Sequence, residues 1–154
     1  MNRRLSSPTK TLVDDARAAL ASCAGLNSRL AARRITQFLE NRMASTGLSV
    51  AQFGLMAHVA AALDDTLGVL AARTGLDQST LSRNLHGLER GGLVEIAIID
   101  TDLRRRSVWL TEVGARRLEV ALPIWQQAHV SLAELIEPHL VSNLATAAET
   151  LLHE

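Results

Sequence analysis

The chain has 154 residues, of which 47% are hydrophobic and 21% are charged, and its 16 basic side chains balance 16 acidic ones. This length and composition predict one globular domain, residues 1–154, and argue against a disordered chain. The single cysteine excludes a disulfide framework and is typical of a reducing cytoplasm, where we expect the protein to be. We expect neither a signal peptide nor a membrane span, since no apolar run approaches about 20 residues.

The charges are distributed unevenly along the chain. Residues 1–48 carry 8 basic and 3 acidic groups, whereas residues 112–154 carry 2 basic and 6 acidic groups. Opposite charges at the two ends favour their association, either within one chain or between two chains.

The N-terminal part is predicted to be a short flexible arm, residues 1–10, followed by a long helix over about 11–44. Gly25 is expected to bend or interrupt this helix. A helix of ~34 residues spans ~50 Å, which is more than one small core covers. Its surplus apolar surface therefore needs a partner chain or the C-terminal helices. Ser49 is expected to cap a second helix over 50–63.

Residues 66–111 contain the pattern on which the functional interpretation depends. Asp77 occupies an N-cap position, and Leu81, Leu85 and Leu88 then recur at i, i+4 and i+7 as one apolar stripe. A helix docked by this stripe presents its polar face outward, as the second helix of a helix-turn-helix does in the DNA major groove. The side chains expected to face base edges or phosphates are Gln78, Ser79, Thr80, Ser82, Arg83 and His86.

A basic hairpin is predicted directly after this helix. Residues 93–99 and 107–110 are rich in β-branched and apolar side chains, and the segment between them is turn-like. In a winged helix, such a hairpin can place arginine in the minor groove, where the negative potential attracts guanidinium. We expect Arg104 to enter that groove and Arg105 and Arg106 to contact the backbone. Each feature alone also fits an ordinary helical hairpin with a solvated charge run, but their order favours a winged helix.

The C-terminal part is predicted to hold two helices. Thr111 is expected to cap a long helix that Pro123 kinks, and a last helix covers residues 139–153. We interpret residues 11–48 and 112–154 as a dimerisation layer around a DNA-binding lobe at 49–111. A two-fold dimer would hold two recognition helices roughly 34–36 Å apart and so bind a palindrome. The predicted fold class is mainly α, a winged helix-turn-helix with a small β-hairpin wing.

Four segments, in order, resemble the MarR family of transcriptional regulators. They are GLSVAQFGLM at Gly47–Met56, LDQSTLSRNLHGLERGGLV at Leu76–Val94, an Asp-x-Arg in the wing, and LTEVG at Leu110–Gly114. The resemblance spans nearly the whole chain and implies a homodimeric regulator of operator DNA, often released by a small ligand or by oxidation. It places the wing aspartate at Asp102, where it would brace the hairpin, and the arginine that reaches DNA at Arg104.

The resemblance also implies an effector pocket where the first, second and fifth helices meet the DNA-binding lobe. In the family this pocket often takes aromatic carboxylates or phenols. Here the implied residues are Phe53, Met56, His58 and Trp125, with Arg29 available for an anion. The alternative is that these residues only pack the core.

Cys23 raises the question of redox sensing, because some relatives oxidise a cysteine near the start of the first helix. Those relatives orient the thiol with tyrosines, and this chain contains no tyrosine. Cys23 also falls on the predicted apolar stripe, where a free cysteine behaves as a small hydrophobic residue. We favour this structural role.

Other chemistry finds little support in the sequence. The 5 histidines have no spacing typical of zinc ligands, and no nucleophile, phosphate-loop or metalloprotease motif is present. We expect no cofactor, no metal and no enzymatic activity. The interpretation we favour is a sequence-specific, ligand-responsive repressor that binds DNA as a dimer. The alternative is a winged-helix module that binds protein, which the near-neutral charge would suit.

Overall fold

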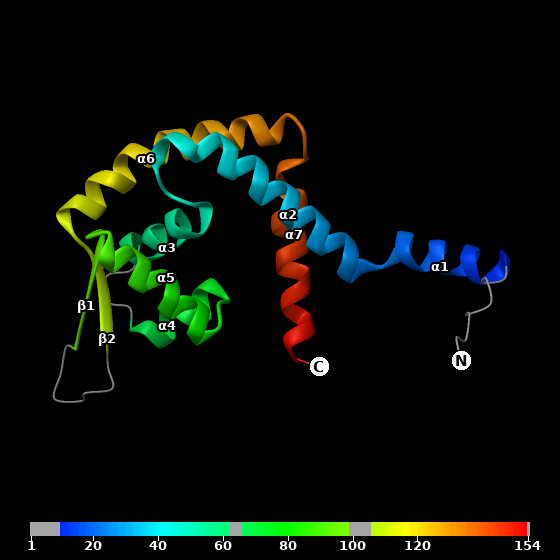
Figure 1. Cartoon of the computed structure of the whole chain (residues 1–154), viewed down its shortest axis with the longest axis horizontal. Helices are drawn as coiled ribbons and strands as arrows, with labels where there is room; N and C mark the ends of the chain where they lie inside the picture. Colours follow the sequence, from blue (N-terminus) through cyan, green and yellow to red (C-terminus); the bar gives the residue numbers. More distant parts are fainter. Residues whose placement is uncertain (1–9, 62–65, 99–105, 154) are drawn as a thin grey trace, which may run out of the picture. The chain divides into compact units, whose positions relative to one another are not determined.

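The computed structural model describes residues 10–61, 66–98 and 106–153 (Figure 1). The chain divides into two compact units, residues 1–37 and residues 38–154, and each is described by itself. Helices account for most of the described residues, and a two-stranded antiparallel hairpin is joined to them. The predicted fold class, mainly α with a hairpin wing, is confirmed.

The first unit contains α1, Lys10–Ser22, and most of α2, Ala24–Met43. The expected interruption of a single long helix exists, but it lies at Cys23, and Gly25 is part of α2. The Asn27 side chain explains this position, because its Nδ2 donates to the carbonyl of Ala21 at 3.0 Å and so satisfies the end of α1. The prediction that Cys23 lies on a helical stripe is therefore wrong, since it is a half-buried connector.

Helix α3, Val50–Ala61, begins after the short 3-10 helix η1, Ala44–Thr46. Ser49 caps it as predicted: the backbone N–H of Gln52 donates to Ser49 Oγ at 3.1 Å, and Gln52 Oε1 accepts from the Ser49 N–H at 2.9 Å. This reciprocal pair is a capping box, which satisfies two N–H groups at once.

The helix-turn-helix consists of α4, Leu67–Thr74, and α5, Gln78–Arg90. Thr66 caps α4, and Gly75 turns the chain with φ +64°, a left-handed conformation that glycine adopts without a steric cost. The predicted stripe of α5 is buried against neighbouring elements: Leu81, Leu85 and Leu88 are 3%, 1% and 0% exposed. Burial of three leucines fixes which face of α5 remains in solvent.

The hairpin pairs β1, Val94–Ile98, with β2, Arg106–Leu110, in antiparallel register from Val94 opposite Leu110 to Ile98 opposite Arg106. Val94 and Val108 are buried and anchor its base on the helical core. An isolated bridge also joins Thr66 to Ser107, so the segment before α4 lies along β2.

Helix α6, Glu112–Ala133, starts at Thr111, whose Oγ1 accepts from the Gly114 N–H at 2.9 Å, as predicted. Gly114 approaches the backbone of Leu93 so closely that a Cβ would lie 1.9 Å from the Leu93 carbonyl oxygen. The helix continues through Pro123. This junction joins α6 to the base of the hairpin.

Helix α7, Pro138–Glu149, starts one residue earlier than predicted, and its end passes into the 3-10 helix η2, Thr150–His153. None of the residues of α7 is buried. In the segments 10–61, 66–98 and 106–153, no helix is long and apolar enough to cross a membrane.

Candidate nucleic-acid interface

The solvent-facing side of α5 carries the side chains that sequence reasoning assigned to DNA. Thr80 is half-buried, and the other five are exposed: Gln78, Ser79, Ser82, Arg83 and His86. The helix has 13 residues and so is about 20 Å long, and the leucine stripe holds it against α3, α4 and β1. One short rigid helix therefore presents a polar surface of the size that a major groove admits.

Asp77 organises the start of this surface. Its Oδ1 accepts from the Thr80 N–H at 2.9 Å and from Ser79 Oγ at 2.6 Å, and its Oδ2 accepts from Thr80 Oγ1 at 2.7 Å. The Ser79 hydroxyl, followed by the backbone and hydroxyl of Thr80, holds the pKa of this carboxyl well below its ordinary value. Asp77 is therefore ionised at neutral pH and acts only as an acceptor.

Arg83 lies one turn further along α5 and is held by the same group of residues. Its Nε donates to the Ser79 carbonyl at 3.3 Å, and its Nη2 donates to Thr80 Oγ1 at 3.4 Å. Both bonds are long, but both use the same edge of the guanidinium. The side chain is thereby oriented along the helix while it remains exposed.

A shallow groove follows along the same face, lined by Arg83, His86, Glu89 and Arg90. His86 Nδ1 lies 3.4 Å from Glu89 Oε2, a distance at which the two form an ion pair when His86 is protonated. Two arginines within one groove suit an anionic ligand, whereas Glu89 offsets part of their charge.

The described part of the wing is its base. Trp109 Nε1 donates to Glu95 Oε2 at 3.1 Å, and the two residues are register partners across the hairpin. Sequence reasoning missed this cross-strand pair, which stiffens the hairpin. Asp102, Arg104 and Arg105 lie outside the described residues, as does the side chain of Arg106, so their predicted roles stay predictions.

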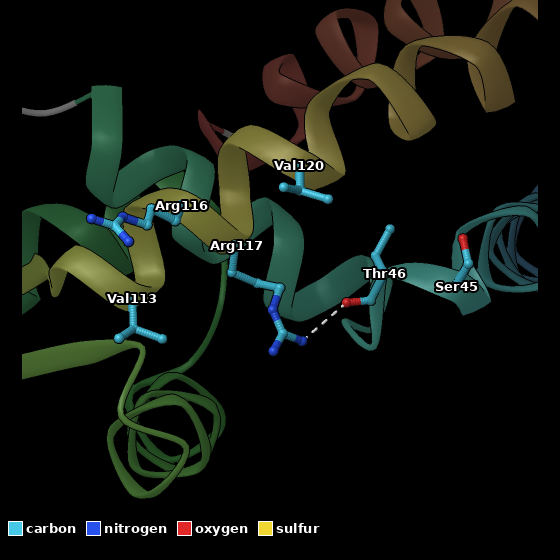
Figure 2. A pocket seen from close by; sticks show the side chains of 6 residues that line it. All are labelled: Ser45, Thr46, Val113, Arg116, Arg117 and Val120. Carbon is cyan, nitrogen blue, oxygen red and sulfur yellow. Dashed lines mark hydrogen bonds between the residues drawn. The ribbon is translucent and has the colours of Figure 1, made fainter.

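Arg117 forms a second contact that the sequence did not reveal. From α6 its Nη1 donates to the Thr46 carbonyl at 3.2 Å, as Figure 2 shows, while Arg116 of the same helix pairs with Glu112. These arginines, with Ser45, Val113 and Val120, line a shallow groove of about 470 Å³. The arginine and valine side chains of this groove are exposed. The hydrogen bond from Arg117 to Thr46 links α6 to η1.

The residues of the predicted effector pocket are only partly brought together. Phe53 and Trp125 stack with ring centroids 5.7 Å apart and planes at 17°. Phe53 and Met56 are buried in the core, whereas His58 is exposed. Arg29 belongs to the unit of residues 1–37, which is described separately.

His129 extends this aromatic stack. Its ring centroid lies 4.0 Å from that of Trp125, and its Nδ1 is 3.0 Å from the Trp125 carbonyl oxygen. Across the described segments no group of three or more histidine, cysteine, aspartate or glutamate side chains could hold a metal ion.

Comparison with known proteins decides the family. Residues 46–105 match the family model described as the MarR family. The crystal structure of the transcriptional regulator MosR from M. tuberculosis in complex with DNA is 31% identical, with a TM-score of 0.74, 84% of this chain and 98% of that chain being covered. The chain belongs to the MarR family.

More distant structures share the MarR-family fold. The repressor CouR bound to a 23-mer DNA duplex is 22% identical, with a TM-score of 0.73, and the alignment covers 94% of this chain and 99% of that one. Wild-type MarR from E. coli in its apo form is 23% identical, with a TM-score of 0.63 and coverage of 84% and 96%. No match was found among curated protein sequences. The predicted family is confirmed.

Proposed function

We propose that this protein is a sequence-specific DNA-binding transcriptional regulator that inserts α5 into the major groove. The observation that carries the proposal is the division of α5 into a face of three buried leucines and an exposed face with Ser79, Arg83 and His86. Membership of the MarR family supports it, and the relative MosR has been crystallised with DNA. Gln78, Thr80 and Ser82 complete the proposed contact surface.

The hairpin is proposed to add minor-groove and backbone contacts. Its base is fixed on the core by Val94 and Val108, and the proposed contacts are made by Arg104, Arg105 and Arg106. Arginine suits a narrow minor groove because its guanidinium meets a concentrated negative potential there. We retain Asp102 as the residue proposed to brace this tip.

A homodimer is proposed as the active form. Every described residue of α7 is exposed, including Leu140, Val141 and Leu144, which are 57%, 44% and 55% exposed. Large apolar side chains on an exposed helix favour burial against another surface. We therefore expect a second copy of the chain to cover α7 and to pair two α5 helices on a palindromic operator.

Ligand response is proposed at the aromatic stack. Trp125 is half-buried and its ring lies against those of Phe53 and His129, so an aromatic or phenolic effector could add a further ring to this stack. Met56 and His58 complete the proposed pocket, and the anion contact expected of Arg29 stays a prediction. An effector that favours a state with the two α5 helices wrongly spaced would release DNA, and the regulator would then act as a ligand-responsive repressor.

Two measurements test this proposal. Fluorescence anisotropy with a labelled random-sequence duplex at low salt should show weak binding that falls steeply as salt is added, because phosphate contacts release counterions. Light scattering after gel filtration should give about twice the 16.6 kDa mass of one chain. A chain that binds no duplex at low salt would instead fit the protein-binding module.

A further inference from the structure

The hydrogen bonds around Asp77 restrict which hydrogen bonds the Ser79 and Thr80 hydroxyls can form with an external partner. Each hydroxyl has a single proton to donate. Ser79 Oγ directs its proton to Asp77 Oδ1 at 2.6 Å, and Thr80 Oγ1 directs its proton to Oδ2 at 2.7 Å. Because the carboxylate has no proton of its own, the donor direction of both bonds is fixed. Only lone pairs remain on these hydroxyls for an external partner.

Thr80 has a further internal contact, since its Oγ1 also accepts from Arg83 Nη2 at 3.4 Å. Ser79 is exposed, so a ligand can reach the lone pairs of its hydroxyl. Phosphate oxygens only accept hydrogen bonds, so they cannot pair with an acceptor. In the major groove the hydrogen-bond donors are the exocyclic amino groups of adenine and cytosine.

We propose that Asp77 is a positioning residue that makes Ser79 a reader of an adenine or cytosine amino group, and not a phosphate contact. This inference rests on the proposed function, since it concerns how α5 discriminates between bases. It narrows the role of Ser79, for which the sequence allowed both base edges and phosphates.

The same hydrogen bonds orient the guanidinium of Arg83 so that it can bind a different base. Its two internal bonds use Nε–H and one N–H of Nη2, on one edge of the guanidinium. The end formed by Nη1 and the second N–H of Nη2 is used by neither bond, and such a fork matches guanine O6 and N7. Ser79 and Arg83 are one helical turn apart, so together they read an amino group and a guanine on nearby base pairs.

The test begins with selection of preferred sites from randomised duplexes by the full-length wild-type protein. Each adenine of the selected site is then replaced by purine, and each cytosine by its analogue without the 4-amino group, one position at a time. With wild type, one position in each half-site should lose roughly twofold to tenfold in affinity. The same replacement should cost Ser79→Ala nothing, because the acceptor that the amino group meets has been removed.

Asp77→Gly provides a second variant in which the helix start is largely retained, since glycine is also favoured at helix N-caps. It removes both carboxylate oxygens, which frees the hydroxyl protons of Ser79 and Thr80. Selection with this variant should relax the preference for an amino group and admit guanine or thymine at the position that Ser79 reads. An unchanged preference at that position would overturn the inference.

The remaining outcomes separate this inference from the proposed function. Ser79→Ala could instead lower the affinity for every duplex by the same factor, or lose as much affinity as wild type at every analogue position. In either case Ser79 is not a base reader, although the protein still binds DNA. If wild type binds no duplex at low salt, the proposed function fails and the inference falls with it. Thermal melting of both variants shows that they are folded.

Discussion

Replacement of Gly114 by alanine should destabilise the protein more than the addition of one methyl group suggests. The added Cβ would lie 1.9 Å from the Leu93 carbonyl oxygen and 2.8 Å from its carbon, whereas ordinary contacts begin at 3.4 Å. The start of α6 and the base of the hairpin would have to separate by about 1.5 Å, because both atoms belong to rigid backbone.

That separation would also strain hydrogen bonds at the same junction. The Thr111 N–H donates to the Leu93 carbonyl at 3.1 Å, and Thr111 Oγ1 donates to the Gly92 carbonyl at 2.6 Å. Overpacking costs about 1–3 kcal/mol, and each lost hydrogen bond costs about 0.5–1.5 kcal/mol. We expect Gly114→Ala to lower the free energy of unfolding by about 3–5 kcal/mol, which for a chain of this length lowers Tm by roughly 6–20 °C.

Gly54→Ala is the matched control, because Gly54 lies inside α3 and a Cβ there meets nothing within 4 Å. Alanine in an open helical position should stabilise the protein by about 0.5–1 kcal/mol. Both variants are compared with wild type by circular dichroism melts at one protein concentration, since dimerisation makes Tm concentration-dependent. A Gly114→Ala protein that melts at or above the wild-type temperature would refute the reasoning from the close approach.

Three further changes probe the DNA-binding surface and its support, and a fourth probes its cap. Arg83→Ala should weaken binding to the preferred duplex by about 1–3 kcal/mol and relax the base preference at one position, which titration of single-base variants measures. Arg105→Ala should weaken binding to all duplexes and reduce the slope of log K against log salt by about one. Leu88→Ala should cost about 2–5 kcal/mol in urea unfolding, because this side chain is 0% exposed. The Asp77 carboxylate should make stability depend on pH, because its pKa is lower in the folded state than its ordinary value of 3.8. This contribution to the free energy of unfolding is present above pH 3.8 and is lost as the pH falls below that value. Asp77→Asn should lack this acid dependence.

A different result would refute each of these predictions. An Arg83→Ala protein with unchanged affinity for every duplex would remove Arg83 from the interface. An Arg105→Ala protein that lost only one base preference would place Arg105 at a base edge. Acid unfolding curves of equal shape for wild type and Asp77→Asn would show that the cap does not carry the predicted linkage.

Helix starts could be predicted well from the sequence, because cap chemistry is local. Ser49, Asp77 and Thr111 were predicted as caps, and each accepts a hydrogen bond from a backbone N–H three residues further on. The leucine stripe of α5 was readable for the same reason, since helical periodicity depends only on spacing. The identity of the polar face followed from the stripe.

The interruption between α1 and α2 was less predictable. Glycine lowers the helical propensity of its position, but it does not fix where a helix ends. The observed break at Cys23 depends on the Asn27 side chain, which reaches back to Ala21 across the connector. Other polar residues near Cys23 could have made such a contact, so the sequence located the interruption only to within two residues.

Contacts between distant segments could not be predicted as pairs. Gly114 lies against the backbone of Leu93, and nothing in the sequence around Gly114 identifies that partner. Arg117 and Thr46 are 71 residues apart, and nothing local to either residue indicates the other. Such pairings follow from the packing of whole elements, which a single sequence specifies only weakly.

The charge of α5 argues that this helix contributes specificity more than general affinity. With its cap it carries Arg83 and Arg90 against Asp77 and Glu89, so the fully charged groups cancel. A neutral helix offers little net attraction to phosphate, whose binding depends on uncompensated cations. The salt-dependent part of the affinity must then come from elsewhere, and the Arg104–Arg106 run of the wing is the cationic cluster nearest in sequence. Changes in α5 should therefore alter base preference at nearly constant salt slope, whereas changes in the wing should alter the slope, and an inverse result would reverse these two roles.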